Sequence, residues 1–123
     1  MKFLLFFFLT IQSLFAAPIQ SITPSEAMEM VKQNHAVMVD VRELDEIKNG
    51  MVKDAIILPL SLINTEAFEE KVQTLPTDKN LILYCKSGRR AGIMGLELEK
   101  RGFAVLNMGG FDAWRNSGLP ITH

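Results

Sequence analysis

Residues 81–102 read LILYCKSGRRAGIMGLELEKRG, and this stretch decides the fold. Its first four residues form a short apolar run of the kind found in buried strands. Over residues 90–100, apolar side chains recur at helical spacing on Ala91, Met94 and Leu98, and a glycine follows the predicted helix. A short buried strand that leads directly into an amphipathic helix is typical of α/β proteins with a parallel sheet.

The alternation of strand and helix patterns extends outward from this stretch. Thr23 is the predicted N-cap of a first helix, Pro24 suits its first position, and Glu26 completes a capping box. Further strands are expected at residues 36–41, 55–58 and 104–108, further helices at 65–72 and around Ala113 and Trp114, and one helical turn with a loop at 43–49. The sequence therefore predicts an α/β domain over residues 18–123, with a central, mostly parallel sheet of four to five strands and helices on both faces.

The composition narrows the class of function. The chain has 123 residues, 48% of them hydrophobic, which suits one domain with a single core and no need for disulfides. A formal net charge of −1 gives no overall attraction to nucleic acid or to acidic membranes. We expect no nucleotide cofactor, because no glycine-rich phosphate-binding motif is present. We also expect no metal site, because His35 and His123 have no partner at ligand spacing.

The N-terminal stretch has the pattern of a secretory signal. Lys2 precedes an apolar run over residues 3–9, and the small residues Ala16 and Ala17 follow. The run is too short for a membrane-spanning helix, which needs about 20 apolar residues. We therefore predict a signal peptide over residues 1–16, a periplasmic or otherwise exported mature protein, and no stable membrane insertion after cleavage.

Cys85 is the only cysteine, and it lies where the predicted strand meets its helix. In an exported chain, an odd cysteine indicates intermolecular pairing or a reactive thiol. Unpaired amides at a helix N-terminus and three basic neighbours favour a thiolate and attract an anionic substrate. The alternative is a small buried hydrophobic residue beside solvated charges. The candidate site consists of Cys85 as nucleophile and, for substrate binding, Lys86, Ser87, Gly88, Arg89 and Arg90.

Three stretches together resemble the single-domain rhodanese family of sulfurtransferases. They are VDVRELDEIKNGMVKDAIILPL at residues 39–60, YCKSGRRA at 84–91 and NMGGFDAW at 107–114. The small size and the leader make the chain most similar to the periplasmic thiosulfate sulfurtransferases. Two departures are Met51-Val52, where the family often has His-Ile, and Asp54 in the usual glycine position.

The resemblance implies a rhodanese fold and a two-step sulfur transfer. Cys85 would take the outer sulfur of thiosulfate, or of another small anionic donor, as a persulfide, and a thiol or cyanide would then accept it. The amides of residues 86–90 would cradle the persulfide. Arg90 matches the arginine of the C-x-x-G-x-R pattern and is favoured to hold the sulfonate, with Arg89 and Lys86 as alternatives.

Other functions stay open at this point. A non-enzymatic persulfide carrier or a partner-binding module would have the same fold. A cysteine phosphatase or arsenate reductase is disfavoured, because five residues normally separate Cys and Arg in those enzymes and Ala91 stands at that position here. Asp40 and Arg42 are expected to make ion pairs or hydrogen bonds that hold loops rather than to act on substrate.

Overall fold

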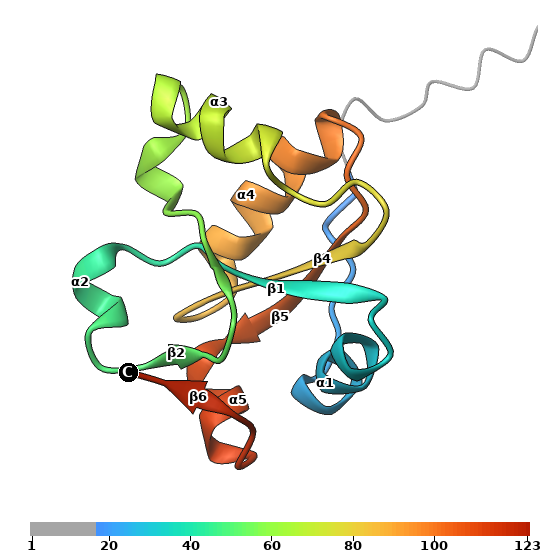
Figure 1. Ribbon diagram of the computed structural model, residues 1–123, viewed down its shortest axis with the longest axis vertical. Helices are drawn as coiled ribbons and strands as arrows, with labels where there is room; N and C mark the ends of the chain where they lie inside the picture. Colours follow the sequence, from blue (N-terminus) through green and yellow to red (C-terminus); the bar gives the residue numbers. More distant parts are fainter. Residues whose placement is uncertain (1–16) are drawn as a thin grey trace, which may run out of the picture.

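The computed structural model describes residues 17–123, and the predicted signal peptide at 1–16 lies outside this range. The chain forms α1 (Pro24–Lys32), β1 (Ala36–Asp40), α2 (Leu44–Ile47), β2 (Met51–Val52), β3 (Ile56–Ile57), the 3₁₀ helix η1 (Leu60–Leu62), α3 (Glu66–Gln73), β4 (Asn80–Cys85), α4 (Arg89–Lys100), β5 (Val105–Gly110), α5 (Phe111–Asn116) and β6 (Ile121–Thr122) (Figure 1). Within the described residues, no helix has the length and apolar character needed to span a bilayer.

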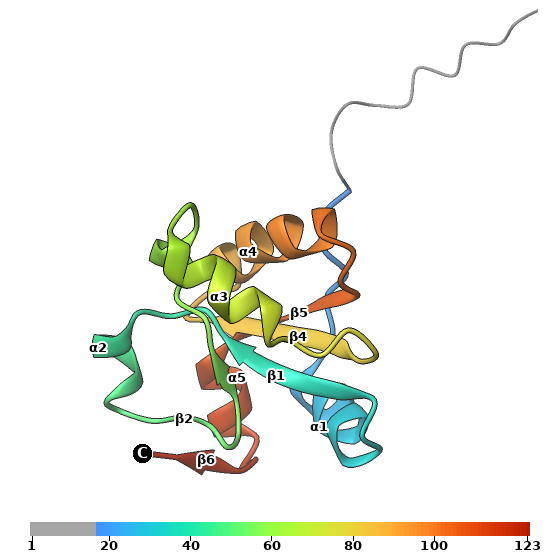
Figure 2. The same cartoon turned by 45° about the horizontal axis from the view of Figure 1, so that its top comes forward.

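The four main strands form one parallel sheet in the order β3-β1-β4-β5. Helices α3 and α4 lie on one face and α1 and α5 on the other (Figures 1 and 2). This confirms the predicted α/β class, the parallel sheet and the helices on both faces. In such a sheet the carboxyl ends of the strands meet along one edge, where ligands usually bind.

The central strand β4 shows why the apolar run is continuous. Leu81, Leu83 and Cys85 pack into the core under α3 and α4, whereas Ile82 and Tyr84 pack into the core on the other face. All five side chains are fully buried, because both faces of the sheet are covered. The first helix begins as predicted, since the Glu26 N–H donates to Thr23 Oγ1 and the Thr23 N–H donates to Glu26 Oε1.

The structure adds a short antiparallel ribbon that the sequence pattern did not predict. β2 pairs with β6, with Met51 opposite Thr122 and Val52 opposite Ile121. Two-residue strands are too short to show a period, and their partners lie far apart in the chain. The departure at Asp54 also has a local cause: its φ is +63°, in the left-handed region that glycine adopts without strain and that aspartate tolerates.

Candidate active site

The loop between β4 and α4 brings a backbone amide to the cysteine sulfur. Gly88 is the N-cap of α4 with a φ of +95°, and its N–H donates to Cys85 Sγ at 3.0 Å. A residue with a side chain is strained at this φ, so glycine suits the turn that directs the amide inward. The structure thus provides one sulfur contact of the cradle expected from residues 86–90.

Cys85 itself is fully buried beneath this loop. Its side chain belongs to the core cluster that includes Ala91 and Met94 of α4. Lys86, Ser87 and Arg89 are exposed, and Gly88 and Arg90 are half-buried. The sulfur is therefore not accessible from solvent in this structure. The sequence left two interpretations of Cys85, a small buried residue and a reactive thiol held by loop amides. The structure has a feature of each, because the thiol is buried and also accepts an amide hydrogen bond.

The glycine-rich end of β5 fixes the loop from the other side. Asn107 Nδ2 donates to the Gly88 carbonyl at 3.0 Å, and the Gly109 N–H donates to Asn107 Oδ1 at 2.8 Å. A Cβ atom added to Gly110 would lie 2.4 Å from the carbonyl oxygen of Lys86. The close approach of two backbones therefore requires glycine at this position.

Gly110→Ala should displace the loop and lower the sulfur reactivity of Cys85. The clash is with backbone, so the loop must shift, and the expected destabilisation is about 1–3 kcal/mol. Urea unfolding and the rate of thiol modification would measure both effects. The matched control is Gly92→Ala, where the new Cβ would lie 3.7 Å from Asn107 Nδ2 and no positive φ opposes it. That helical position should gain about 0.5–1 kcal/mol; equal effects of the two variants would contradict the prediction.

Arg90 is engaged by Glu46 of α2. Its Nη1 and Nη2 donate to the two carboxylate oxygens at 2.6 and 2.7 Å, and the Glu43 N–H also donates to Glu46 at 2.9 Å. Chiefly through the hydrogen bonds from Arg90, the pKa of Glu46 falls to about 2. The same hydrogen bonds raise the pKa of Arg90. Lys86 and Arg89, in contrast, form no ion pair with any residue from 17 to 123.

Sequence reasoning missed Glu46 because no local pattern marks it. It lies 44 residues before Arg90, in a polar stretch that predicted only a helical turn and a loop. The sequence favoured Arg90 as the residue that holds the sulfonate of the donor. In this structure its guanidinium contacts the Glu46 carboxylate. That Arg90 holds a sulfonate stays a prediction.

The Arg90–Glu46 pair should stabilise the fold above about pH 4.5 and lose its effect in acid. The folded pKa of Glu46, about 2, lies below its ordinary value of 4.5, so the contribution is complete above pH 4.5 and disappears as pH falls toward 2. Urea unfolding of the wild type and Glu46→Gln would show a stability difference at pH 7 that shrinks between pH 4.5 and 2. A difference that is constant with pH would contradict this assignment.

The DVR segment forms a buried network behind the active-site loop. Arg42 Nη2 donates to Asp40 Oδ2 and to the Gly50 carbonyl, each at 2.8 Å. The Tyr84 hydroxyl donates to Asp40 at 2.5 Å and accepts the Val52 N–H at 3.0 Å. Burial raises the pKa of Tyr84 well above its usual range. The expected ion pair and hydrogen bonds of Asp40 and Arg42 are therefore present in the structure.

A sequence profile described as Rhodanese-like domain matches residues 23–117. The chain belongs to the rhodanese-like domain family. It is similar to a sulfurtransferase from Allochromatium vinosum, with 35% identity over 79% of this chain and 88% of that protein. It is also similar to a thiosulfate sulfurtransferase from Actinobacillus succinogenes, with 26% identity over 81% of this chain and 87% of that protein.

Solved rhodanese structures support the same family. A rhodanese-related protein from Thermoplasma volcanium superimposes with a TM-score of 0.70 at 27% identity, over 84% of this chain and 97% of that one. The segments 39–60, 84–91 and 107–114 that suggested a rhodanese all lie within the matched range. The first segment supplies Asp40 and Arg42 of the buried network and also Glu46, the second supplies the Cys85 loop, and the third supplies the glycines beside the loop.

Proposed function

We propose that this rhodanese-like protein is a thiosulfate sulfurtransferase that works through a persulfide on Cys85. The thiolate of Cys85 attacks the outer sulfur of thiosulfate, and a new S–S bond forms. The S–S bond of thiosulfate breaks, and its electron pair leaves with sulfite. A thiol or cyanide then takes the outer sulfur and returns Cys85 as thiolate. The hydrogen bond from the Gly88 amide to Sγ carries this proposal.

Electrostatics around the loop support an anionic sulfur donor. Helix α4 begins at the loop, so its N-terminal amides and dipole favour negative charge there. Lys86 and Arg89 are exposed and have no acid partner in the described part of the chain. The relative from Actinobacillus succinogenes, named a thiosulfate sulfurtransferase, adds support at the level of sequence.

The experiment that tests this function is mass spectrometry of the protein before and after incubation with thiosulfate. We expect the addition of one sulfur atom to Cys85 and release of thiocyanate when cyanide is added. Sulfur addition without turnover would contradict the proposed enzyme and indicate a persulfide carrier. Hydrolysis of p-nitrophenyl phosphate would indicate a phosphatase instead. The same spectrum of protein from the exported fraction tests our proposal that residues 1–16 are removed during export to the periplasm.

Arg90→Ala should raise the apparent KM for thiosulfate. The change removes a cation near the loop. It also leaves the Glu46 carboxylate without its partner, and this unpaired negative charge repels the thiosulfate dianion. The double variant Arg90→Ala with Glu46→Gln separates the two causes. A KM that stays high assigns the contact to Arg90 itself, whereas a KM that returns to the wild-type value moves the contact to Arg89 or Lys86. An unchanged KM in the single variant would contradict the prediction.

A further inference from the structure

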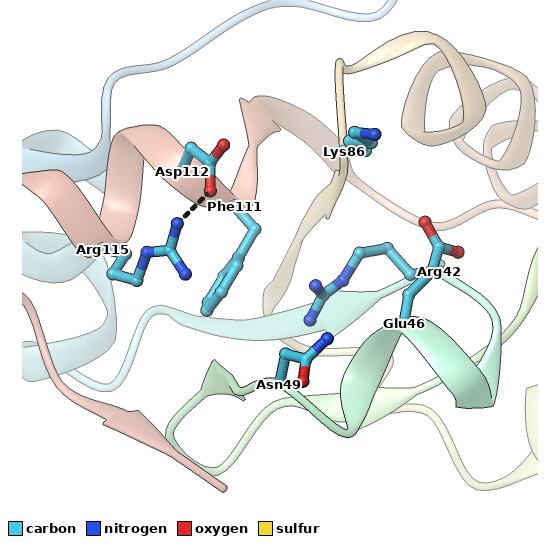
Figure 3. A pocket seen from close by; sticks show the side chains of 7 residues that line it. All are labelled: Arg42, Glu46, Asn49, Lys86, Phe111, Asp112 and Arg115. Atoms are coloured by element: carbon cyan, nitrogen blue, oxygen red, sulfur yellow. Dashed lines mark hydrogen bonds and ion pairs between the residues drawn. The ribbon is translucent and has the colours of Figure 1, made fainter.

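A pocket of about 230 Å³ lies beside the Cys85 loop, between α2 and α5 (Figure 3). Arg42, Asn49, Lys86 and Phe111 contribute to its lining. Apart from Lys86, none of these side chains has a part in the donor step proposed above. The pocket therefore needs its own chemical interpretation.

Arg42 presents a hydrogen-bond donor to this pocket. Its side chain is only 7% exposed, and its Nε and Nη2 atoms donate to Asp40 and to the Gly50 carbonyl. No acceptor for Nη1 occurs among residues 17–123. Every buried side-chain polar atom in that range has a partner, so Nη1 cannot be enclosed by protein. Figure 3 shows the guanidinium directed into the pocket, where an anionic acceptor would complete its hydrogen bonds.

The remaining charges of the lining favour an organic anion. Both acids at the pocket are already paired, Glu46 with Arg90 and Asp112 with Arg115 at 2.8 Å. Lys86 has no such partner in the described part of the chain. Phe111 provides an apolar wall, with the Arg42 guanidinium carbon 4.4 Å from its ring centroid. An inorganic ion would use the cations but not this wall, whereas a carboxylate on a short carbon chain would use both.

The pocket lies next to the Cys85 loop along the backbone, while the Cys85 side chain itself packs on the α3/α4 side of the sheet. Lys86 directly follows Cys85, and Gly110, which precedes Phe111, is the strand partner of Cys85. Neighbouring strands are about 4.8 Å apart. The pocket and the Cys85 loop are therefore adjacent at the carboxyl edge of the sheet.

We propose that this pocket binds the carboxylate of the sulfur acceptor, and that the acceptor is a small thiol carrying that carboxylate. This inference rests on the proposed function of Cys85. The acceptor thiolate attacks the outer sulfur of the Cys85 persulfide and forms a new S–S bond. The bond between that sulfur and Sγ breaks, its electron pair stays on Sγ, and the acceptor leaves as a persulfide. Arg42 and Lys86 hold the carboxylate and take no part in bond making.

The kinetic test compares two acceptors that differ in charge, mercaptopropionate and mercaptoethanol. Asn49→Asp places a negative charge at the exposed rim of the pocket without disturbing the buried Arg42 pair. Lys48→Gln is the matched control, since it changes the charge of the neighbouring exposed residue by the same amount outside the lining. The ratio of kcat/KM for mercaptopropionate over mercaptoethanol should fall about fivefold or more in Asn49→Asp only. Equal ratios in both variants would overturn the proposal.

A binding test measures carboxylate binding in the pocket without sulfur transfer at Cys85. Propionate has the carboxylate but no thiol, and propanol is its neutral counterpart. Nuclear magnetic resonance titration of the wild-type protein with propionate should shift the Asn49 and Phe111 signals saturably, and propanol should not. Absence of these shifts, or their persistence in Asn49→Asp, would overturn the proposal that the pocket binds a carboxylate. If thiosulfate adds no sulfur to Cys85, the proposed function fails instead, and this titration still decides whether the pocket binds a carboxylate.

Discussion

Cys85→Ser is expected to abolish sulfur transfer, with a loss of about a thousandfold or more in thiocyanate formation from thiosulfate and cyanide. The serine hydroxyl is a weak nucleophile at neutral pH and cannot form a persulfide. Because Cys85 is the only cysteine in the sequence, no other thiol can replace it. Mass spectrometry after thiosulfate treatment should therefore detect a sulfur adduct on the wild type and none on the variant.

The control for this experiment is the fold. Cys85 is fully buried, so the thermal unfolding of Cys85→Ser must be compared with that of the wild type. Cys85→Ala removes the thiol without adding a buried hydroxyl, and the two variants should lose activity equally. Appreciable turnover in either folded variant would show that the transferred sulfur does not pass through Cys85, and the proposed mechanism would be wrong.

Asp40→Ala should lower the free energy of unfolding by about 3–5 kcal/mol. Asp40 is fully buried, pairs with Arg42 and accepts the Tyr84 hydroxyl. Removal of its carboxylate leaves a buried guanidinium without a counter-charge, which costs more than the ion pair itself contributes. Since whole domains are stable by about 5–15 kcal/mol, urea unfolding should show a variant close to the limit of folding.

Two matched variants separate the network from a general effect of lost charge. Asp112→Ala breaks an exposed pair with Arg115 and should change the stability little. Tyr84→Phe removes only the hydroxyl that joins Asp40 to the Val52 amide, and should cost about 1–3 kcal/mol. A loss in Asp112→Ala equal to that in Asp40→Ala would contradict the role of the buried network.

Most of the fold could be predicted because its signals are local. The capping box at Thr23 and Glu26 and the helical spacing after Arg90 each depend on residues a few positions apart, and the structure contains both helices. The apolar run of β4 predicted a strand with both faces covered, and its side chains are buried on both faces. The β2–β6 ribbon was missed because two residues carry no period and the pairing joins distant segments.

The amino-acid order by itself determined that a lone cysteine stands between a buried strand and a helix, with glycine and basic residues after it. Only the tertiary structure decided that Glu46 pairs with Arg90, that Cys85 lies fully beneath its loop, and that Arg42 faces a pocket beside it. The periodicity of a sequence indicates which residues share a face of one helix or strand. Contacts along the carboxyl edge of the sheet depend on strand order, which brings together residues more than 40 positions apart.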